Sequence, residues 1–516
     1  MLNFKNIKMK KILILLALVV AFGSCDEGFE EMNVNPTKPT QLEPKLKLTY
    51  AQLATNGQDG IRYLFGNLIY VHSVTQYIST LWADGVYYTE NDSRTSQVFD
   101  FSYPTAVKTV VDLVNQLENT EDSPTKDVDL AIAQVQKVLI LSRITDLYGD
   151  IPYSEAGRGF IDGIRFPKYD KQSEIYADML AKLEAAAAVL KNGGASSYGS
   201  ADIFFNGDAT KWNKFTNSLM LRLAMRMVKV DNAGAETWAT KAINGGLMES
   251  NADIAYLKYD AISAKWDIQG NPFIQSIATR ANTQVRMVST FVDAMKDKGD
   301  PRLSIWCSLV DGDTNPANQM GMPPGFGTTD VGALPNTDIF AYSMPSIAVV
   351  GTGDNRSNYN QPFILQSYAE VEFMLAEAAE RWGLAGGDVQ GHYETAVRAA
   401  MKQLSLFNNA APITDGQVDT YLLANPFNSS DALEMIGDQY WLAVFPNAIE
   451  GWQNWKRTGF PVLVPVDSPR GVTGGVIPRR LPYTNAEKLN NTANVEAASA
   501  QQGGDLLTTR MWWDIN

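Results

Sequence analysis

The sequence ILQSYAEVEFMLAEAAERW occupies residues 364–382. Its apolar side chains recur every three or four positions, at Leu365, Tyr368, Val371, Leu375, Ala378 and Trp382. This spacing places them on one face of an α-helix. Gly386 and Gly387 then stop the pattern, and it starts again from Val389 to Leu404. Because both segments carry an apolar face with small residues, they predict two helices that pack against each other.

Three further pairs of segments follow the same helical pattern. We expect helices at 128–147 with 172–191, at 209–229 with 236–243, and at 430–445 with 448–457. Helix pairs that need neighbours to bury their apolar faces are the principle of a tetratricopeptide-like (TPR-like) array. The sequence therefore predicts a mostly α fold, built on four TPR-like helix pairs.

Long segments rich in Gly, Pro, Asn and aromatic residues interrupt the helix pairs, at 149–171, 247–363 and 461–516. Such composition is typical of loops with short helices and strands. We therefore expect a single globular unit over 45–516. Its helical scaffold is predicted at about 128–246 and 364–457, and a second, loop-rich lobe at about 45–127, 247–363 and 461–516.

The amino terminus has the composition of a secretory signal peptide. Four lysines and no acidic residue surround the start, an apolar run follows from Ile12 to Phe22, and two small residues lead to Cys25. The run is too short to span a hydrocarbon core of ~30 Å. A Cys at this position fits the bacterial lipobox. We therefore expect 1–24 to be removed, Cys25 to be lipidated and 25–44 to form a flexible tether; the alternative is an ordinary signal peptide with an incidental Cys.

Charge and cysteine content narrow the class of protein. The formal net charge is −14, and it becomes −18 once the four lysines of the signal peptide are removed. So acidic a chain is not expected to hold nucleic acid through phosphate contacts or to adhere to anionic lipid, which leaves membrane attachment to the acyl chains on Cys25. The only other cysteine is Cys307. No intramolecular disulfide is then available, and we expect Cys307 to be buried as a small apolar side chain.

Several stretches occur in an order that is typical of one protein family. They are DLYGDIPYSEA at 146–156, WNKFTNSLMLRLAMR at 212–226, DPRL at 300–303, GMPPG at 321–325, YAEVEFMLAEAAE at 368–380, EGWQNWKRT at 450–458 and IPRRLPY at 477–483. In these motifs, in their order and in its lipobox, the chain resembles the SusD/RagB family of outer-membrane nutrient-binding lipoproteins.

This resemblance implies a lipid-anchored protein, exposed at the cell surface, that caps a TonB-dependent (SusC-like) barrel transporter and delivers nutrient to it. Glycans are the usual ligands in the family, and some members bind peptides. The resemblance also implies binding without turnover and without a cofactor. Three functions therefore stay open: capture of an oligosaccharide or polysaccharide, capture of a peptide, and, in a different class, hydrolysis at the cell surface.

Residues for catalysis or metal binding do not form a readable pattern. His72 and His392 are the only histidines, and no ligand-spaced Cys accompanies them, so neither a zinc site nor a catalytic triad is indicated. Asp311 and Asp313 resemble part of a calcium loop that lacks its closing Glu. The four glutamates within 368–380 could suggest paired catalytic carboxylates, but we expect them to be solvated or paired with nearby bases. We predict no catalytic residue and no metal.

Two aromatic clusters outside the helical pattern are the candidates for a ligand site. Sugars present C–H faces that stack on aromatic rings, while polar side chains serve their hydroxyls; peptides would require apolar pockets and an edge strand. In the family, the ligand face combines the loop after an early helix with the lobe between the second and third helix pairs. The predicted contacts there are Trp82, Tyr87, Tyr88, Asn91 and Arg94 in one loop, and Trp266 and Asn271 in the lobe. The alternative is that Trp82 and Trp266 only pack the lobe.

Five other tryptophans lie close to the predicted helices or at the carboxyl end, and we expect all of them in the core. They are Trp441, Trp452, Trp455, Trp512 and Trp513.

Overall fold

The computed structural model describes residues 42–56, 59–82, 84–260, 266–278, 280–351 and 358–515. The predicted signal peptide and Cys25 lie outside these residues. Contacts divide the chain into Met1–Glu43 and Pro44–Asn516, and the elements below all belong to the second unit.

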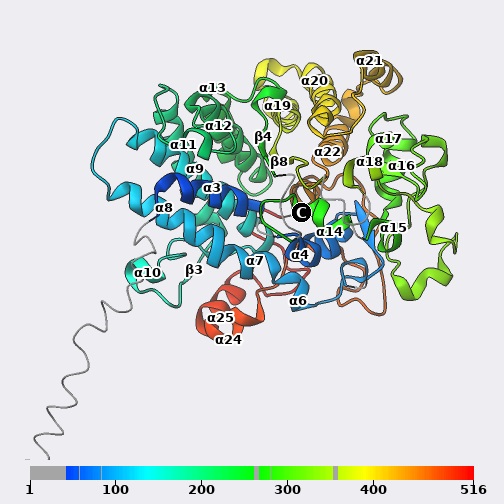
Figure 1. Cartoon of the computed structure of the whole chain (residues 1–516), viewed down its shortest axis with the longest axis horizontal. Helices are drawn as coiled ribbons and strands as arrows, with labels where there is room; N and C mark the ends of the chain where they lie inside the picture. The colour runs from blue at the N-terminus through cyan, green and yellow to red at the C-terminus, as the bar shows by residue number, and fades with distance from the viewer. Residues whose placement is uncertain are drawn as a thin grey trace, which may run out of the picture. The chain divides into compact units, whose positions relative to one another are not determined.

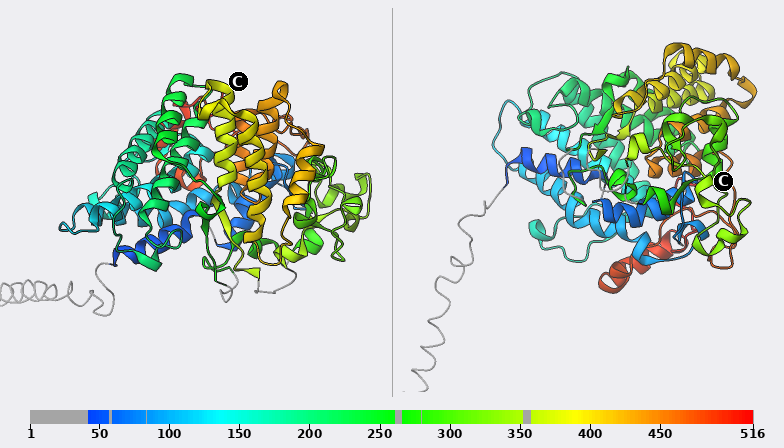
Figure 2. Two further views of the ribbon diagram at one scale, coloured as in Figure 1. Left: turned by 90° about the horizontal axis from the view of Figure 1, so that it is seen from above. Right: turned by 45° about the vertical axis from the view of Figure 1, so that its right-hand side comes forward.

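Eight helices make up the four pairs predicted for the scaffold. They are α9 (Lys126–Tyr148) with α11 (Gln172–Leu190), α12 (Ala209–Arg226) with α13 (Asn232–Gly245), α19 (Tyr368–Trp382) with α20 (Val389–Lys402), and α22 (Ala432–Ala443) with α23 (Ala448–Thr458). The pairs are joined where α11 meets α12, α12 meets α19 and α19 meets α22. Figure 1 shows the array running from α9 and α11 to α20 and α22, and Figure 2 shows its helices side by side. The prediction of a mostly helical, TPR-like scaffold is confirmed.

Helix α19 begins four residues later than the sequence pattern suggested. Ser367 caps it: the Ser367 hydroxyl accepts from the Glu370 N–H at 3.2 Å, and the Glu370 carboxylate accepts from the Ser367 N–H at 3.0 Å. The residues before this cap form strand β8 (Phe363–Gln366), which pairs with β4 (Ala255–Leu257). The predicted helix over 364–367 is therefore wrong, because the capping box fixes where the helix starts and the preceding backbone belongs to a sheet.

The segment before the scaffold is more helical than its composition suggested. It contains α3 (Pro44–Leu53) and α8 (Lys108–Glu118); α3 packs on α8, and α8 packs on α9. The sequence also predicts a helical stretch over 61–81, before the loop of Trp82. In the structure this stretch is made of α4 (Gly60–Tyr63), the π-helical η2 (Leu64–Val71) and α5 (His72–Val74). It ends before strand β1 (Ile78–Thr80), so the last part of that prediction is wrong.

Short strands and helices occupy the segments between the pairs, as expected from their composition. The described strands form two-stranded antiparallel ladders: β1 with β5 (Val285–Met287), β2 (Ile151–Pro152) with β3 (Tyr169–Asp170), β4 with β8, and β6 (Cys307–Ser308) with β7 (Met344–Pro345). The remaining α-helices are α6 (Asp92–Thr95), α7 (Gln97–Ser102), α10 (Gly159–Asp162), α14 (Pro272–Ile277), α15 (Ala281–Gln284), α16 (Ser289–Lys296), α17 (Leu303–Trp306), α18 (Ile347–Val350), α21 (Asp415–Ala424), α24 (Asn485–Asn490) and α25 (Thr492–Gln501).

A buried cluster of charges connects one helix of each pair. Arg222 of α12 donates to Glu370 of α19 at 2.5 Å, and Arg226 of α12 donates to Glu450 of α23 at 2.7 Å and lies 3.4 Å from Asp146 of α9. Burial raises the pKa of both glutamates, but Arg226 and Arg222 outweigh it at Glu450 and hold that pKa at about 2. At Glu370 burial prevails and the pKa is raised. The four pairs thus share one set of mutually dependent charges.

Two more of the scaffold glutamates are buried and paired. The Glu377 carboxylate accepts from Arg457 at 2.6 Å and from Arg381 at 2.7 Å, and Glu372 lies 2.6 Å from Nδ1 of His392. Burial would raise the pKa of Glu377, but Arg457 and Arg381 lower it to about 2. The expected pairing with bases is confirmed, whereas the expectation of solvated carboxylates is wrong for these side chains.

Both histidines have structural roles. His72 is fully buried, its ring stacks on Phe273 at 5.5 Å between centroids, and burial lowers its pKa to about 3. It is therefore neutral at physiological pH. At His392 the hydrogen bond with Glu372 raises the pKa.

Four of the five tryptophans assigned to the core are buried: Trp441, Trp452, Trp455 and Trp513. Trp512 is the exception, because it lies at the edge of the core and is only partly buried. Cys307 has no exposed surface, so the prediction that it is buried as a small apolar side chain is confirmed; burial raises the pKa of its thiol.

Candidate ligand-binding site

The pairing of β1 with β5 determines where Trp82 lies. In this ladder Thr80 faces Val285, and the Leu81 N–H donates to the Gln284 carbonyl at 2.8 Å. Trp82 follows directly and therefore lies beside the residues that precede β5. Its side chain is half-buried.

Arg280 is close to both of the predicted tryptophans. Its guanidinium carbon lies 5.8 Å from the ring centroid of Trp82 and 5.2 Å from that of Trp266. Both distances are within the range of cation–π attraction. Burial lowers the pKa of Arg280, but a guanidinium stays protonated at neutral pH. One cation thus brings together two half-buried aromatic residues from separate segments of the chain.

Trp266 is held in an unfavourable backbone conformation. Its φ is 66°, in the left-handed region that costs a non-glycine residue ~1–2 kcal/mol. Gly60 makes room for the ring: a Cβ added there would lie 2.8 Å from Cε3 of Trp266 and 2.5 Å from Cβ of Gln275. Strain of this kind persists only where the surroundings impose it, and it concentrates at binding sites.

Asp84 organises the loop that follows Trp82. Its φ is 80°, and its carboxylate accepts from Asn91 Nδ2 at 3.0 Å, from Arg94 Nε at 3.0 Å and from the Thr89 hydroxyl at 3.2 Å. The Arg94 guanidinium carbon also lies 4.3 Å from the centroid of the Phe65 ring. Asn91 and Arg94, both predicted ligand contacts, therefore have a clear role in shaping this loop.

Tyr87 faces a different set of residues. Its hydroxyl donates to Asp330 and accepts from Arg470 Nη1 at 2.7 Å, and the Arg470 guanidinium carbon lies 4.8 Å from the ring centroid. These three residues, with Phe326 among others, line a cavity of about 410 Å³. The structure thus places Tyr87 with Asp330 and Arg470, whereas Arg280 joins Trp82 to Trp266.

Tyr88 and Asn271 are each only 1% exposed. Asn271 caps α14 by accepting from the Ile274 N–H at 3.2 Å, and its amide donates to the carbonyls of Gln361 and Pro362 at 3.0 and 3.1 Å. Their observed role is structural, and a direct ligand contact by either stays a prediction.

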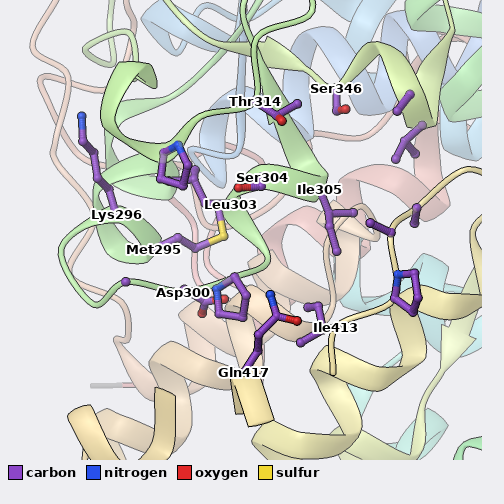
Figure 3. Close-up of a pocket in the computed structure, with 18 of the residues that line it drawn as sticks. Met295, Lys296, Asp300, Leu303, Ser304, Ile305, Thr314, Ser346, Ile413 and Gln417 are labelled. Carbon is purple, nitrogen blue, oxygen red and sulfur yellow. The ribbon is translucent and has the colours of Figure 1, made fainter. Parts of the chain in front are cut away.

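A cavity of about 460 Å³ lies on another part of the lobe, around α16 and α17 (Figure 3). Aliphatic side chains such as Leu303, Ile305 and Ile413 line it, together with the hydroxyl residues Ser304 and Ser346. No aromatic ring is among its lining residues. It therefore lacks the stacking surface that a sugar requires.

Sequence reasoning missed Arg280, Asp84 and Arg470. None lies in a recognisable motif. The only signal for Arg280 would have been the pairing of β1 with β5, two strands of three residues each, and such short strands have no distinctive pattern.

Within the described ranges, no cluster of three or more His, Cys, Asp or Glu side chains has the geometry to hold a metal ion. No helix among the same residues is long and apolar enough to cross a membrane.

Comparison with protein families gives one match, to the SusD-like family described as "Starch-binding associating with outer membrane", over residues 37–484. Comparison with curated proteins found no match.

Solved structures resemble the chain over almost its whole length. A chitin-binding protein is 32% identical, with a TM-score of 0.80 over 92% of this chain and 100% of that one. A chitin-binding SusD homolog from Flavobacterium johnsoniae is 25% identical, with a TM-score of 0.75 over 91% of this chain and 99% of that one. A SusD homolog from Bacteroides uniformis is 25% identical, with a TM-score of 0.74 over 92% and 100%. With a family match that spans most of its residues and the same helical scaffold, the chain belongs to the SusD-like family.

Proposed function

We propose that this chain is a glycan-binding lipoprotein of the outer membrane, which captures an oligosaccharide at Trp82 and Trp266 and delivers it to a TonB-dependent barrel transporter. The observation that carries this proposal is the position of Arg280, whose guanidinium lies within 6 Å of both half-buried rings. Two aromatic surfaces and a hydrogen-bond donor at one place match a sugar, which offers C–H faces and hydroxyl oxygens together.

Chitin oligosaccharides are the first ligand to test. The 32% identical structure is named a chitin-binding protein, and so is the homolog from Flavobacterium johnsoniae. Starch oligosaccharides come second, because the family description names starch. Selectivity between chitin and starch oligosaccharides would come from the loops that carry Trp82 and Trp266, since the helical scaffold is common to the family.

The protein binds its ligand without hydrolysing it. Two of the four glutamates that could suggest a catalytic pair are held inside the scaffold: Glu370 by Arg222, and Glu377 by Arg457 and Arg381. A carboxylate that pairs with an arginine in the core cannot reach a glycosidic bond. Release of reducing ends from chitohexaose by the purified protein would overturn this part of the proposal.

Titration of tryptophan fluorescence tests the ligand. We expect a saturable change when a soluble form, residues 26–516, is titrated with chitohexaose or maltohexaose. The double variant Trp82→Ala/Trp266→Ala should bind roughly 5-fold to 150-fold more weakly, since two aromatic contacts of ~0.5–1.5 kcal/mol each contribute ~1–3 kcal/mol together. Trp238→Ala is the matched control, because Trp238 is also half-buried beneath a cation, with Lys241 Nζ 4.1 Å from its ring. A response to peptides and none to either glycan would overturn the proposal.

Cell fractionation tests the anchor and the partner. A Cys25→Ala protein should leave the membrane fraction and appear as a soluble secreted protein, whereas Cys307→Ala should stay with the membrane. If Cys25→Ala protein still sediments with outer membrane after the barrel transporter is deleted, another attachment exists. Co-purification of the wild-type protein with a barrel transporter supports delivery; its absence from every such preparation contradicts it.

A further inference from the structure

A second cavity with an aromatic wall lies where three distant segments meet. Its volume is about 380 Å³, and its lining comes from Asp150 after α9, from 171–173 at the start of α11, and from 501–502, 510–512 and Ile515 near the carboxyl end. It shares no lining residue with the cavity of Tyr87 or with that of Figure 3.

Trp512 is the aromatic residue of this cavity, and it differs from its neighbour Trp513. Trp513 is fully buried and its indole N–H donates to Asp146 at 3.1 Å. Trp512 is only partly buried and lines the cavity. Tyr176 packs against Trp512 with the ring centroids 5.5 Å apart at 60°, which fixes the orientation of the indole. The ring is therefore oriented by the scaffold and borders an open space.

Polar side chains surround this ring at the surface. Lys171, Gln501 and Arg510 are exposed lining residues. Gln501 Nε2 donates to Asp150 at 2.7 Å, and Arg510 Nη1 lies 3.1 Å from Asp514. These contacts orient an amide and a guanidinium beside the indole while leaving each of them further hydrogen-bonding capacity.

Gln172, one of the residues that line the cavity, has an unsatisfied side-chain acceptor. Gln172 is fully buried; its Nε2 donates to the Thr145 carbonyl at 2.9 Å, but its Oε1 has no hydrogen-bond partner among the described residues. Leaving a buried amide oxygen unpaired costs ~1–3 kcal/mol, so a donor at this oxygen is favoured. A hydroxyl group is the smallest ligand group that supplies one.

The chemistry of these groups identifies the ligand class. Asp150 already accepts from the Gln172 N–H at 2.8 Å as well as from Gln501, and Arg510 is paired with Asp514, so the carboxylate is already hydrogen-bonded and the guanidinium already has a countercharge within the protein. What the cavity offers is an indole face, amides and an orphan acceptor, which together suit a polyhydroxylated ring.

We propose that this cavity is a second glycan-contact site, with Trp512 as its stacking surface. The ligand class rests on the proposed function, but the site is separate. Two contacts on one chain would hold a long polysaccharide more tightly than either alone, because the second contact becomes intramolecular once the first has formed.

Fluorine NMR on protein labelled with 5-fluorotryptophan tests both sites at once. The resonances of Trp82, Trp266, Trp512 and the control Trp238 are assigned from single Trp→Phe variants, and chitohexaose and maltohexaose are then titrated. We expect the Trp512 resonance to shift saturably while that of Trp238 does not move.

Each pattern of shifts decides a different question. Shifts of Trp82 and Trp266 without Trp512 overturn the second site and leave the proposed function standing. A shift of Trp512 alone supports the second site and overturns the proposed first one. No shift of any of the three rings with either glycan overturns both.

Retention on insoluble chitin gives an independent measurement. Trp512→Ala should bind the polymer about threefold to tenfold more weakly than wild type, the range expected for one lost aromatic contact, and Trp512→Phe should recover most of the loss. Binding by Trp512→Ala that equals that of Trp238→Ala would overturn the proposal.

Discussion

Arg226 Nη2 lies 2.7 Å from both carboxylate oxygens of Glu450, although the two residues are 224 positions apart in the sequence. Arg226 is on α12, in the second helix pair, and Glu450 is on α23, in the fourth. Both side chains are buried. This ion pair joins the second and the fourth helix pairs, and Asp146 and Glu370 of the same cluster add the first and the third.

Arg226→Ala should lower the free energy of unfolding by ~3–5 kcal/mol, because it leaves Glu450 buried without its main partner. Arg398→Ala is the control: Arg398 pairs with Asp419 but is 41% exposed, and loss of a surface pair costs at most ~1 kcal/mol. Urea unfolding of the two variants measures the difference. Equal losses of unfolding free energy in the two variants would show that the buried pair stabilises the protein no more than the surface pair does.

Acid should destabilise the protein through Glu377. Its pKa is about 2 in the folded chain against an ordinary value of 4.5, so the stabilising charge is fully present above pH 4.5 and is lost as the pH falls toward 2. The contribution is on the order of 3 kcal/mol. Glu377→Gln should therefore flatten the fall in unfolding free energy between pH 4.5 and 2.5. Glu380→Gln, at an exposed position on the same helix, should leave it unchanged.

Gly60→Ala should weaken glycan binding. The new methyl would collide with Trp266 and with the Cβ of Gln275, so these side chains must shift, which changes the position of the Trp266 ring relative to Arg280. We expect at least a threefold loss of affinity for chitohexaose, roughly half of one aromatic contact. Gly416→Ala, where an added Cβ meets nothing within 4 Å, is the matched control. Unchanged affinity in Gly60→Ala would show that ligand binding does not depend on the position of the Trp266 ring.

Replacing Asp84 should loosen the loop after Trp82. Asp84→Ala removes the acceptor shared by Asn91, Arg94 and Thr89, and hydrogen exchange of the backbone amides at 85–95 should become faster. Asp84→Gly loses the same contacts but relieves the strain of a φ of 80°. It should therefore be more stable than Asp84→Ala by ~1 kcal/mol. If Asp84→Ala is the more stable variant, the backbone strain inferred here is absent.

The helices of the scaffold could be predicted because each carries a long apolar stripe. The pattern from Tyr368 to Trp382 extends over four turns, and its caps are chemically explicit in Ser367 and Gly383. The start of α19 was misplaced because strand β8 has apolar residues at positions that also fit a helix. Short apolar runs do not distinguish the two.

The candidate site could be predicted only in part. Aromatic composition drew attention to Trp82 and Trp266, and the structure connects them through Arg280. Arg280 itself, and the role of Asp84 in the loop, depend on contacts between short segments far apart in the chain. The sequence analysis assigns Trp512 to the core together with Trp513, because sequence alone does not separate a buried ring from the partly exposed one beside it.

Because β1 pairs with β5, the proposed site at Trp82 and Trp266 can assemble only in a chain that extends beyond β5. A chain that ends before Val285 contains Trp82 but lacks the strand that holds Ile78–Thr80 in register. It lacks α19–α23 as well, and with them the partners of Arg222 and Arg226. A truncated or partly exported copy therefore lacks the assembled form of the proposed site, and only a full-length molecule is expected to bind ligand there.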